Sequence, residues 1–230
     1  MTAAQVESRI LAALAGVRDP ELDEPVTVLG FVASAVVEAD GTARVHLRLP
    51  TYFCAPNFAY LMVADAYDAV AALDEVRRAE VVLDDHFASD AINAGVAARA
   101  GFRKSFAGEA VDELDDLRAD FLRKAVLAGT DVVCRPLAMP GTLTLGDVPP
   151  STDLDRLRRR RAELGLPADD ASPLLIDPST GCAIEPGQVP LHLRRARLTR
   201  TSLDANTGIC RGMLRHRYST DGQGEEAPDE

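Results

Sequence analysis

The cysteine at position 54 is the residue of this sequence best placed to do chemistry. Cys54 stands two residues before Pro56, which suits the first turn of a helix predicted over residues 56–73. The N-terminus of a helix carries partial positive charge and free N–H groups, so a thiolate there is stabilised and becomes more reactive. Such a sulfur suits a metal or sulfur carrier, and the alternative is a cysteine buried in the core.

The other three cysteines are widely spaced, and no CxxC pair occurs, so a self-contained zinc site is not expected. Residues 177–182 and 204–210 each contain the pattern Asp-x-[Ser/Asn]-Thr-Gly ahead of a cysteine, and this composition is typical of tight turns. We expect two matching β-hairpin turns. They either bring Cys182 and Cys210 together as a second thiol pair or leave both as isolated thiols.

The elements that must position Cys54 follow from hydrophobic periodicity. Helical spacing of apolar residues and period-two alternation predict a helix at 2–15, strands at 26–38 and 43–49, a helix at 56–73, a strand at 76–83 and a helix at 89–100. Asp40-Gly41 is a hairpin turn signal between the first two strands. Cys54 is therefore expected in the loop between the hairpin and the second helix.

The rest of the chain divides at Gly101. We expect a longer amphipathic helix near 109–128, a proline-rich linker near 136–152, a basic helix at 153–165 and then the two hairpin turns. The fold class is α+β: a small α-β-β-α-β-α domain with a mixed three-stranded sheet, then a helix and a small β-rich C-terminal module. The expected divisions are a domain at 1–105, a helix and linker at 106–150, a basic α/β module at 151–218 and a disordered tail at 219–230.

The composition excludes several classes of protein. The chain has 230 residues, of which 47% are hydrophobic and 27% charged, as in an ordinary globular protein. A net charge of −11 argues against nucleic-acid binding, and no apolar run is long enough to span a membrane. No signal peptide is recognised, so we expect a cytoplasmic protein with reduced thiols. Two arginine clusters, within 156–161 and 194–200, are either solvated faces or a docking surface for an acidic partner.

Four short motifs, in order, carry a resemblance to a known family. They are Asp19-Pro20-Glu21, Leu29-Gly30-Phe31-Val32, Pro50-Thr51-Tyr52-Phe53-Cys54, and His86 with Ser89, Asp90, Ile92 and Asn93. Over about residues 5–105 the chain resembles the SufT/PaaD-like iron–sulfur cluster assembly domains. This resemblance implies that Cys54 binds a cluster or metal, with His86 and Asn93 in the matching later segment.

The residues around Cys54 leave alternatives open. Thr51 either donates a hydrogen bond to the thiolate or caps the following helix. Asp19 and Glu21 either place a carboxylate beside bound iron or form a turn with surface charge. His86 is either a ligand or an ordinary loop residue, and Asn93 has a supporting role by resemblance alone.

The resemblance implies a non-enzymatic maturation factor that carries iron or an iron–sulfur cluster transiently. Its partners are then a client metalloenzyme and the assembly machinery, with the C-terminal extension selecting the client. The whole chain also resembles assembly-type proteins of bacterial binuclear-iron monooxygenases. Because one cysteine cannot hold a cluster, we expect a homodimer that pairs two copies of Cys54. The alternatives are a metal-free adaptor and an enzyme in which Cys54 and His86 act as nucleophile and base, without a third orienting group.

Overall fold

The computed structural model describes residues 2–110 and 112–219, which form two compact units. Unit 1 comprises the described residues of Met1–Leu114 and Thr207–Glu230, and unit 2 comprises Asp115–Asn206. Unit 1 is therefore built from two separate stretches of the sequence. The predicted disordered tail falls, from residue 220 onward, outside the described residues.

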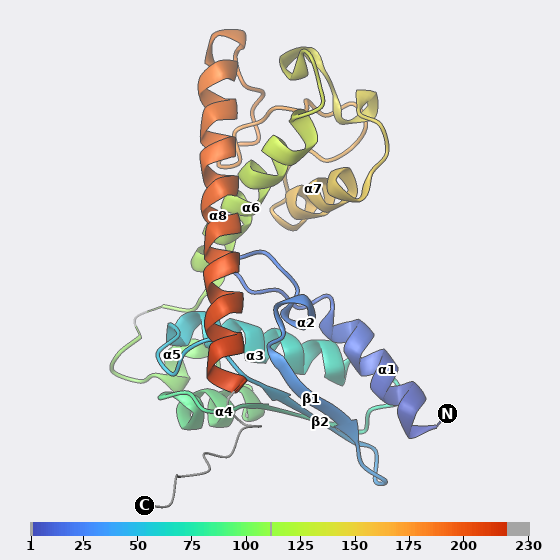
Figure 1. The fold of residues 1–230 in the computed structure, drawn as a ribbon, viewed down its shortest axis with the longest axis vertical. Coiled ribbons are helices and arrows are strands. Elements are labelled where there is room, and N and C mark those ends of the chain that lie inside the picture. The colour runs from blue at the N-terminus through green and yellow to red at the C-terminus, as the bar shows by residue number, and fades with distance from the viewer. Residues whose placement is uncertain (1, 111, 220–230) are drawn as a thin grey trace, which may run out of the picture. The chain divides into compact units, whose positions relative to one another are not determined.

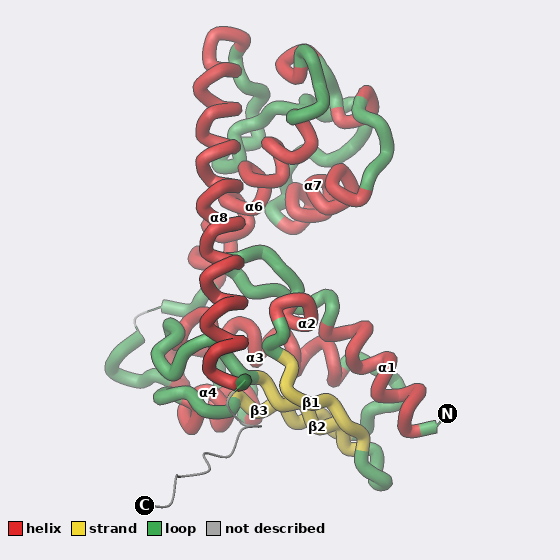
Figure 2. Tube along the Cα trace, viewed as in Figure 1, coloured by secondary structure: helices red, strands yellow, loops and turns green. Residues whose placement is uncertain are grey.

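Unit 1 contains the mixed three-stranded sheet that the sequence predicted, and its strands lie in the order β1-β2-β3 (Figures 1 and 2). Strand β1 (Val32–Val37) pairs antiparallel with β2 (Thr42–Leu47), and β2 pairs parallel with β3 (Arg78–Leu83). Parallel neighbours need a crossover connection, and helix α3 (Pro56–Ala71) supplies it. The loop that holds Cys54 is the first part of this crossover.

The remaining elements of unit 1 are helices. They are α1 (Ala3–Leu14), α2 (Val26–Leu29), α4 (Ser89–Ala97), α5 (Phe102–Ser105) and the C-terminal part of α8 (Val189–Tyr218). Helix α1 begins where the sequence predicted, because Thr2 and Gln5 form a capping box.

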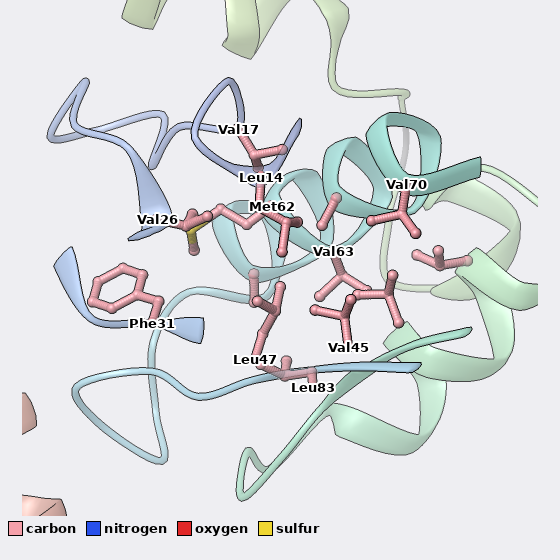
Figure 3. Close-up of a cluster of buried hydrophobic side chains, with 14 of the residues drawn as sticks. Leu14, Val17, Val26, Phe31, Val45, Leu47, Met62, Val63, Val70 and Leu83 are labelled. Carbon is pink, nitrogen blue, oxygen red and sulfur yellow. The ribbon is translucent and has the colours of Figure 1, made fainter. Parts of the chain in front are cut away.

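The core of unit 1 forms between the sheet and helix α3. Val45 and Leu47 of β2 and Leu83 of β3 pack with Val63 and Val70 of α3, as Figure 3 shows. The alternation of β2 puts its buried residues on this side, whereas Arg44 and His46 remain partly exposed. The period-two pattern therefore predicted the buried face of this strand correctly.

The prediction for the first strand is wrong over its first residues. Residues 26–29 form the one-turn helix α2, and the strand begins only at Val32. Pro25 precedes this helix, and Gly30 ends it in the left-handed region with φ +80°. Proline at the start and glycine at the end of a helical turn outweigh the β-branched composition of 26–29.

Unit 2 is helical where a β-rich module was expected. It contains α6 (Asp115–Cys134), α7 (Thr152–Glu163), the short 3-10 turns η1 (Pro140–Thr142), η2 (Leu145–Asp147) and η3 (Pro186–Gln188), and the first part of α8. Among its described residues there are isolated β-bridges and no strand. Helix α6 also starts later than predicted, and Glu113 ahead of it accepts a hydrogen bond from the Phe102 N–H.

Of the two expected hairpin turns, the first exists and the second does not. Gly181 N–H bonds the Asp177 carbonyl at 2.8 Å, and Ile176 bridges Ala183 across this turn. Residues 204–210 lie instead inside helix α8. The two patterns differ at their second residue, which is Pro178 in the first and Ala205 in the second. Proline prevents helix formation there, and alanine favours it.

A buried arginine organises the core of unit 2. Arg161 is fully buried, and its guanidinium donates to the carbonyls of Pro173 at 3.0 Å and Leu174 at 2.5 Å. Burial lowers the pKa of Arg161 to about 10. In the arginine cluster of residues 194–200, Arg200 donates to the buried carboxylate of Asp131 at 2.6 Å. Arg161 and Arg200 thus hold the interior of unit 2 together.

No helix in the described parts of the chain is long and apolar enough to cross a membrane.

Candidate functional site

The loop between β2 and α3 presents the sulfur of Cys54 at a partly exposed position. Thr51 Oγ1 lies 3.3 Å from Cys54 Sγ and also accepts a hydrogen bond from the Phe53 N–H at 3.2 Å. Because the hydroxyl already accepts that N–H, its own hydrogen is available to the sulfur. The N-cap of α3 is Ala55, with no side-chain cap, so Thr51 contacts the sulfur and does not cap the helix.

His86 holds the main chain of Cys54. Its Nε2 lies 2.7 Å from the Cys54 carbonyl oxygen, and its Nδ1 accepts a hydrogen bond from the Ala88 N–H at 3.1 Å. Nε2 therefore carries the proton and donates to Cys54. Burial, together with the positive charge of Arg217, lowers the pKa of His86 and favours this neutral form. Both ring nitrogens are engaged, which gives His86 a positioning role here and leaves no free lone pair for a metal.

Asp19 forms the turn that the sequence left open for it, but it does so as a buried residue. Its Oδ1 accepts hydrogen bonds from the N–H groups of Glu21 at 2.9 Å and Leu22 at 2.8 Å, so it forms a turn. The residue is only 8% exposed, however, so this carboxylate is not surface charge. Burial raises the pKa of Asp19 to about 6, against the lowering effect of its two backbone hydrogen bonds. Glu21 is only partly buried.

Asn93 links helix α4 to strand β3. Its side-chain amide pairs with the main chain of Leu83, accepting from the N–H at 2.8 Å and donating to the carbonyl at 3.1 Å. This bond fixes α4 to the end of β3, immediately before the loop that carries His86. Asn93 makes no described hydrogen bond to Cys54, and its supporting role at the site stays a prediction.

Three exposed aromatic rings border the Cys54 loop. Tyr52, Phe53 and Phe87 are 44%, 76% and 49% exposed, and we call them the aromatic rim. The ring centroid of Phe53 lies 5.0 Å from that of Tyr52 and 5.9 Å from that of Phe87. Only 5% of this chain is aromatic, so three exposed rings next to one thiol are a concentrated apolar surface. Surfaces of this kind are typical of protein interaction sites.

Sequence reasoning missed the C-terminal end of α8 as part of this site. Arg217 donates to the Leu49 carbonyl at 3.1 Å and to the Asp85 carbonyl at 2.6 Å, and it also pairs with the Asp85 carboxylate. Leu49 and Asp85 lie in the two loops that carry Cys54 and His86. Contacts between residues so far apart in the sequence leave no local pattern from which to predict them.

Cys210 lies in this same C-terminal part of α8 and belongs to unit 1. It packs against the core cluster that Cys54 also contacts. Burial first, and then the negative charges of Asp19, Cys54 and Glu21, raise the pKa of its thiol to about 11. Cys182, the partner expected from the repeated pattern, is exposed in unit 2.

The described residues contain no preformed metal site. Within residues 2–110 and 112–219, no group of three His, Cys, Asp or Glu side chains is arranged to hold a metal ion. Thiolates are the usual ligands of iron–sulfur clusters. The described part of one chain therefore offers the Cys54 thiol without a complete ligand set beside it.

Comparison with known proteins gives one family match and a similar solved structure. A search of curated proteins gives no match. A solved structure described as a domain of unknown function DUF59 from Bacillus anthracis is 22% identical, covering 43% of this chain and 92% of its own, with a TM-score of 0.33. Residues 7–82 match the family described as "Iron-sulfur cluster assembly protein". The segment of this chain that is similar to iron–sulfur cluster assembly proteins is therefore the one that holds Asp19, Glu21, Thr51 and Cys54.

Proposed function

We propose that this protein carries iron or an iron–sulfur cluster on Cys54 and delivers it to a client metalloenzyme. The observation that carries the proposal is the setting of the Cys54 sulfur. It is partly exposed, lies 3.3 Å from the Thr51 hydroxyl, and falls within the segment that matches iron–sulfur cluster assembly proteins. A hydrogen bond to an ionised sulfur stabilises the form that binds metal.

Delivery to a protein is supported by the aromatic rim. Tyr52 and Phe53 directly precede Cys54, so a partner that covers these rings also approaches the sulfur. Aromatic residues contribute much of the binding energy of protein interfaces. The rim is therefore the surface on which we place the client during transfer.

The geometry favours a carrier over an enzyme with a nucleophile and a base. A catalytic base must reach the proton of its nucleophile. His86 instead donates to the carbonyl of Cys54 and accepts from the Ala88 N–H, so neither nitrogen is left to take a proton from Sγ. The function we propose is accordingly non-enzymatic, of the SufT/PaaD type that the sequence resembles.

We further propose that the carrier acts as a symmetric homodimer in the cytoplasm. Iron–sulfur clusters usually need four thiolates, and a two-fold axis can bring matching sulfurs of two chains together. Unit 2, which lies outside the matched segment, would select the client. The resemblance of the whole chain to monooxygenase assembly proteins supports a binuclear-iron monooxygenase as that client.

Anaerobic reconstitution tests the proposal. The full-length protein is incubated with ferrous iron and sulfide, and visible absorption is recorded for the wild type, for Cys54→Ser and for the control Cys182→Ser. We expect a cluster chromophore in the wild type and in the control, and its loss in Cys54→Ser. An unchanged chromophore in Cys54→Ser would refute Cys54 as the carrier. If the same variant also activated the client normally, the metal-free adaptor would be the better description.

A further inference from the structure

We infer that α8 binds an acidic amphipathic helix of the client protein through the side that it exposes in unit 2. This side, the α8 outer face, consists of Leu191, Arg194, Arg195, Leu198, Ser202 and Ala205. The inference deepens the proposed function, on which it rests for naming the client as the partner. It gives unit 2, as the part that selects the client, a binding surface and a chemistry.

The two sides of α8 in unit 2 differ in burial. Ala196 is fully buried and His192 is 8% exposed, and Val189 and Leu193 pack against the core of unit 2. These residues mark the side that α8 turns toward the interior of this unit. At 3.6 residues per turn, the α8 outer face lies on the opposite side of the helix from Ala196. It is therefore an unpartnered face of a helix that is firmly packed on its other side.

Two leucines give the α8 outer face an apolar stripe. Leu191 and Leu198 are 43% and 65% exposed and stand seven residues apart, and Ala205 continues this spacing. Side chains at intervals of seven residues contact a partner helix that lies along the first helix, as in coiled coils. The spacing therefore favours a helix as the occupant of this face.

The arginine cluster of residues 194–200 divides between the interior of unit 2 and the α8 outer face. Arg200 donates to the Asp131 carboxylate at 2.6 Å, and Arg197 lies 3.7 Å from the same carboxylate. Arg194 and Arg195 are exposed and pair with no carboxylate among the residues that the structure describes. A carboxylate of α6 thus serves two arginines of α8, whereas the other two lack such a partner. The charge that complements the α8 outer face is therefore negative.

Charge also favours the client over a second copy of this chain. The α8 outer face contains no acidic residue, so the same face of a second copy offers no carboxylate to Arg194 and Arg195. Burying guanidinium groups without a partner is unfavourable. The aromatic rim of unit 1 consists of uncharged rings, so recognition of a client by its charge needs a different surface. Two leucines and two arginines make a small contact, which suits a complex that releases its partner after transfer.

Fluorescence anisotropy of a designed peptide tests the inference on the full-length protein without metal. The probe is a labelled helical peptide of about 18 residues, with leucines at heptad spacing and glutamates beside them. Its binding should weaken about tenfold in Arg194→Glu, in Arg195→Glu and in Leu198→Ser. The matched control is Arg159→Glu, which changes the charge equally at an exposed residue of α7 and should bind like the wild type. Circular dichroism checks that each variant is folded.

Reversing the charges on both partners sharpens the test. A peptide with lysine in place of each glutamate should not bind the wild type, and it should bind the double variant Arg194→Glu/Arg195→Glu. If the glutamate peptide bound this double variant as tightly as the wild type, the inference would be overturned. Equal weakening in Arg159→Glu would also overturn it, because the attraction would then be unspecific.

Other occupants of the face would give distinct results. The acidic segment 220–230 of this chain, added as a peptide, should not displace the probe. Displacement would assign the face to the chain's own tail and overturn the inference. A dimer that Leu198→Ser converts to a monomer in analytical ultracentrifugation would assign the face to a second copy, with the same consequence. The carrier proposal is decided separately, because the chromophore of Cys54→Ser is measured without peptide and peptide binding is measured without metal.

Discussion

Replacing Asp19 by asparagine should stabilise unit 1 at neutral pH. The buried carboxylate is unfavourable when ionised, because burial raises its pKa to about 6 from an ordinary value of 3.8. Asparagine keeps an oxygen that accepts the N–H groups of Glu21 and Leu22, and it carries no charge. The variant therefore removes the cost of desolvating a charge and retains the turn.

The size of the effect follows from the pKa difference. One pKa unit corresponds to about 1.36 kcal/mol, so the shift of Asp19 makes the ionised folded state about 3 kcal/mol less stable. The folded pKa is raised, so this cost is absent below pH 3.8 and is fully present above pH 6. The free energy of unfolding of Asp19→Asn should exceed that of the wild type by about 3 kcal/mol at pH 7.5 and by about half as much at pH 5.

Tyrosine fluorescence during urea unfolding measures this effect in the right part of the molecule. The chain has no tryptophan, and its four tyrosines, at positions 52, 60, 67 and 218, all belong to unit 1. The matched control is Asp40→Asn, which changes the net charge equally. Asp40 is fully exposed, and its pKa is lowered chiefly by the Thr42 N–H, so this control should bring no gain.

Two results would refute this reasoning. One is an Asp19→Asn variant no more stable than the wild type at pH 7.5. The other is a gain of the same size at pH 5 and pH 7.5, because a change in packing alone does not depend on the ionisation of a carboxyl group. A confirmed gain would mean that the wild-type chain keeps an unfavourable buried charge in the segment that matches the iron–sulfur assembly family, as expected of a residue retained for function and not for stability.

Three further predictions concern the Thr51 hydroxyl, the buried guanidinium of Arg161 and the bonds by which Arg217 holds the end of α8. Thr51→Val should slow iodoacetamide alkylation of Cys54 about fivefold, since it removes a hydrogen bond of about 1 kcal/mol to the ionised sulfur. Arg161→Ala should lower the stability of unit 2 by about 3–5 kcal/mol, followed by circular dichroism during urea unfolding, because two carbonyls lose their donor. Arg217→Ala should speed alkylation of Cys210, measured by mass spectrometry, because α8 loses its bonds to Leu49 and Asp85.

Each of these predictions has a control in the same region. Thr51→Ser keeps the hydroxyl and should react like the wild type. Arg159→Ala removes an exposed arginine of α7, 54% accessible, and should change stability little. Arg215→Ala removes an exposed residue one turn from the end of α8 and should leave Cys210 protected. If a control variant changed the rate or stability as much as the variant it is compared with, the role assigned to Thr51, Arg161 or Arg217 would be contradicted.

The local signals in the sequence were enough to predict most of unit 1. The Thr2 capping box, the alternation of β2 and the proline at the start of α3 each act within a few residues, so they can be recognised without tertiary structure. The Cys54 loop followed from these elements. The one-turn helix α2 also had a local signal, Pro25 with Gly30, which the β-branched composition between them obscured.

The parts that could not be predicted depend on distant contacts or on context. The short pattern shared by residues 177–181 and 204–208 forms a turn only where Pro178 prevents a helix. The role of α8 at the site depends on Arg217, which is 168 residues from the carbonyl it bonds at Leu49. A contact between residues so far apart in the sequence is specified by the completed fold, so it cannot be predicted from composition or periodicity.

The division of unit 1 into two stretches has a consequence for how the protein is made. Cys54 leaves the ribosome early, but the helix end that carries Cys210 and Arg217 is synthesised only after all of Asp115–Asn206. At roughly 5–20 residues per second, this interval lasts several seconds or more. Until then the nascent chain lacks the Arg217 bonds to Leu49 and Asp85, so the surroundings of the Cys54 loop are completed only when translation is almost finished.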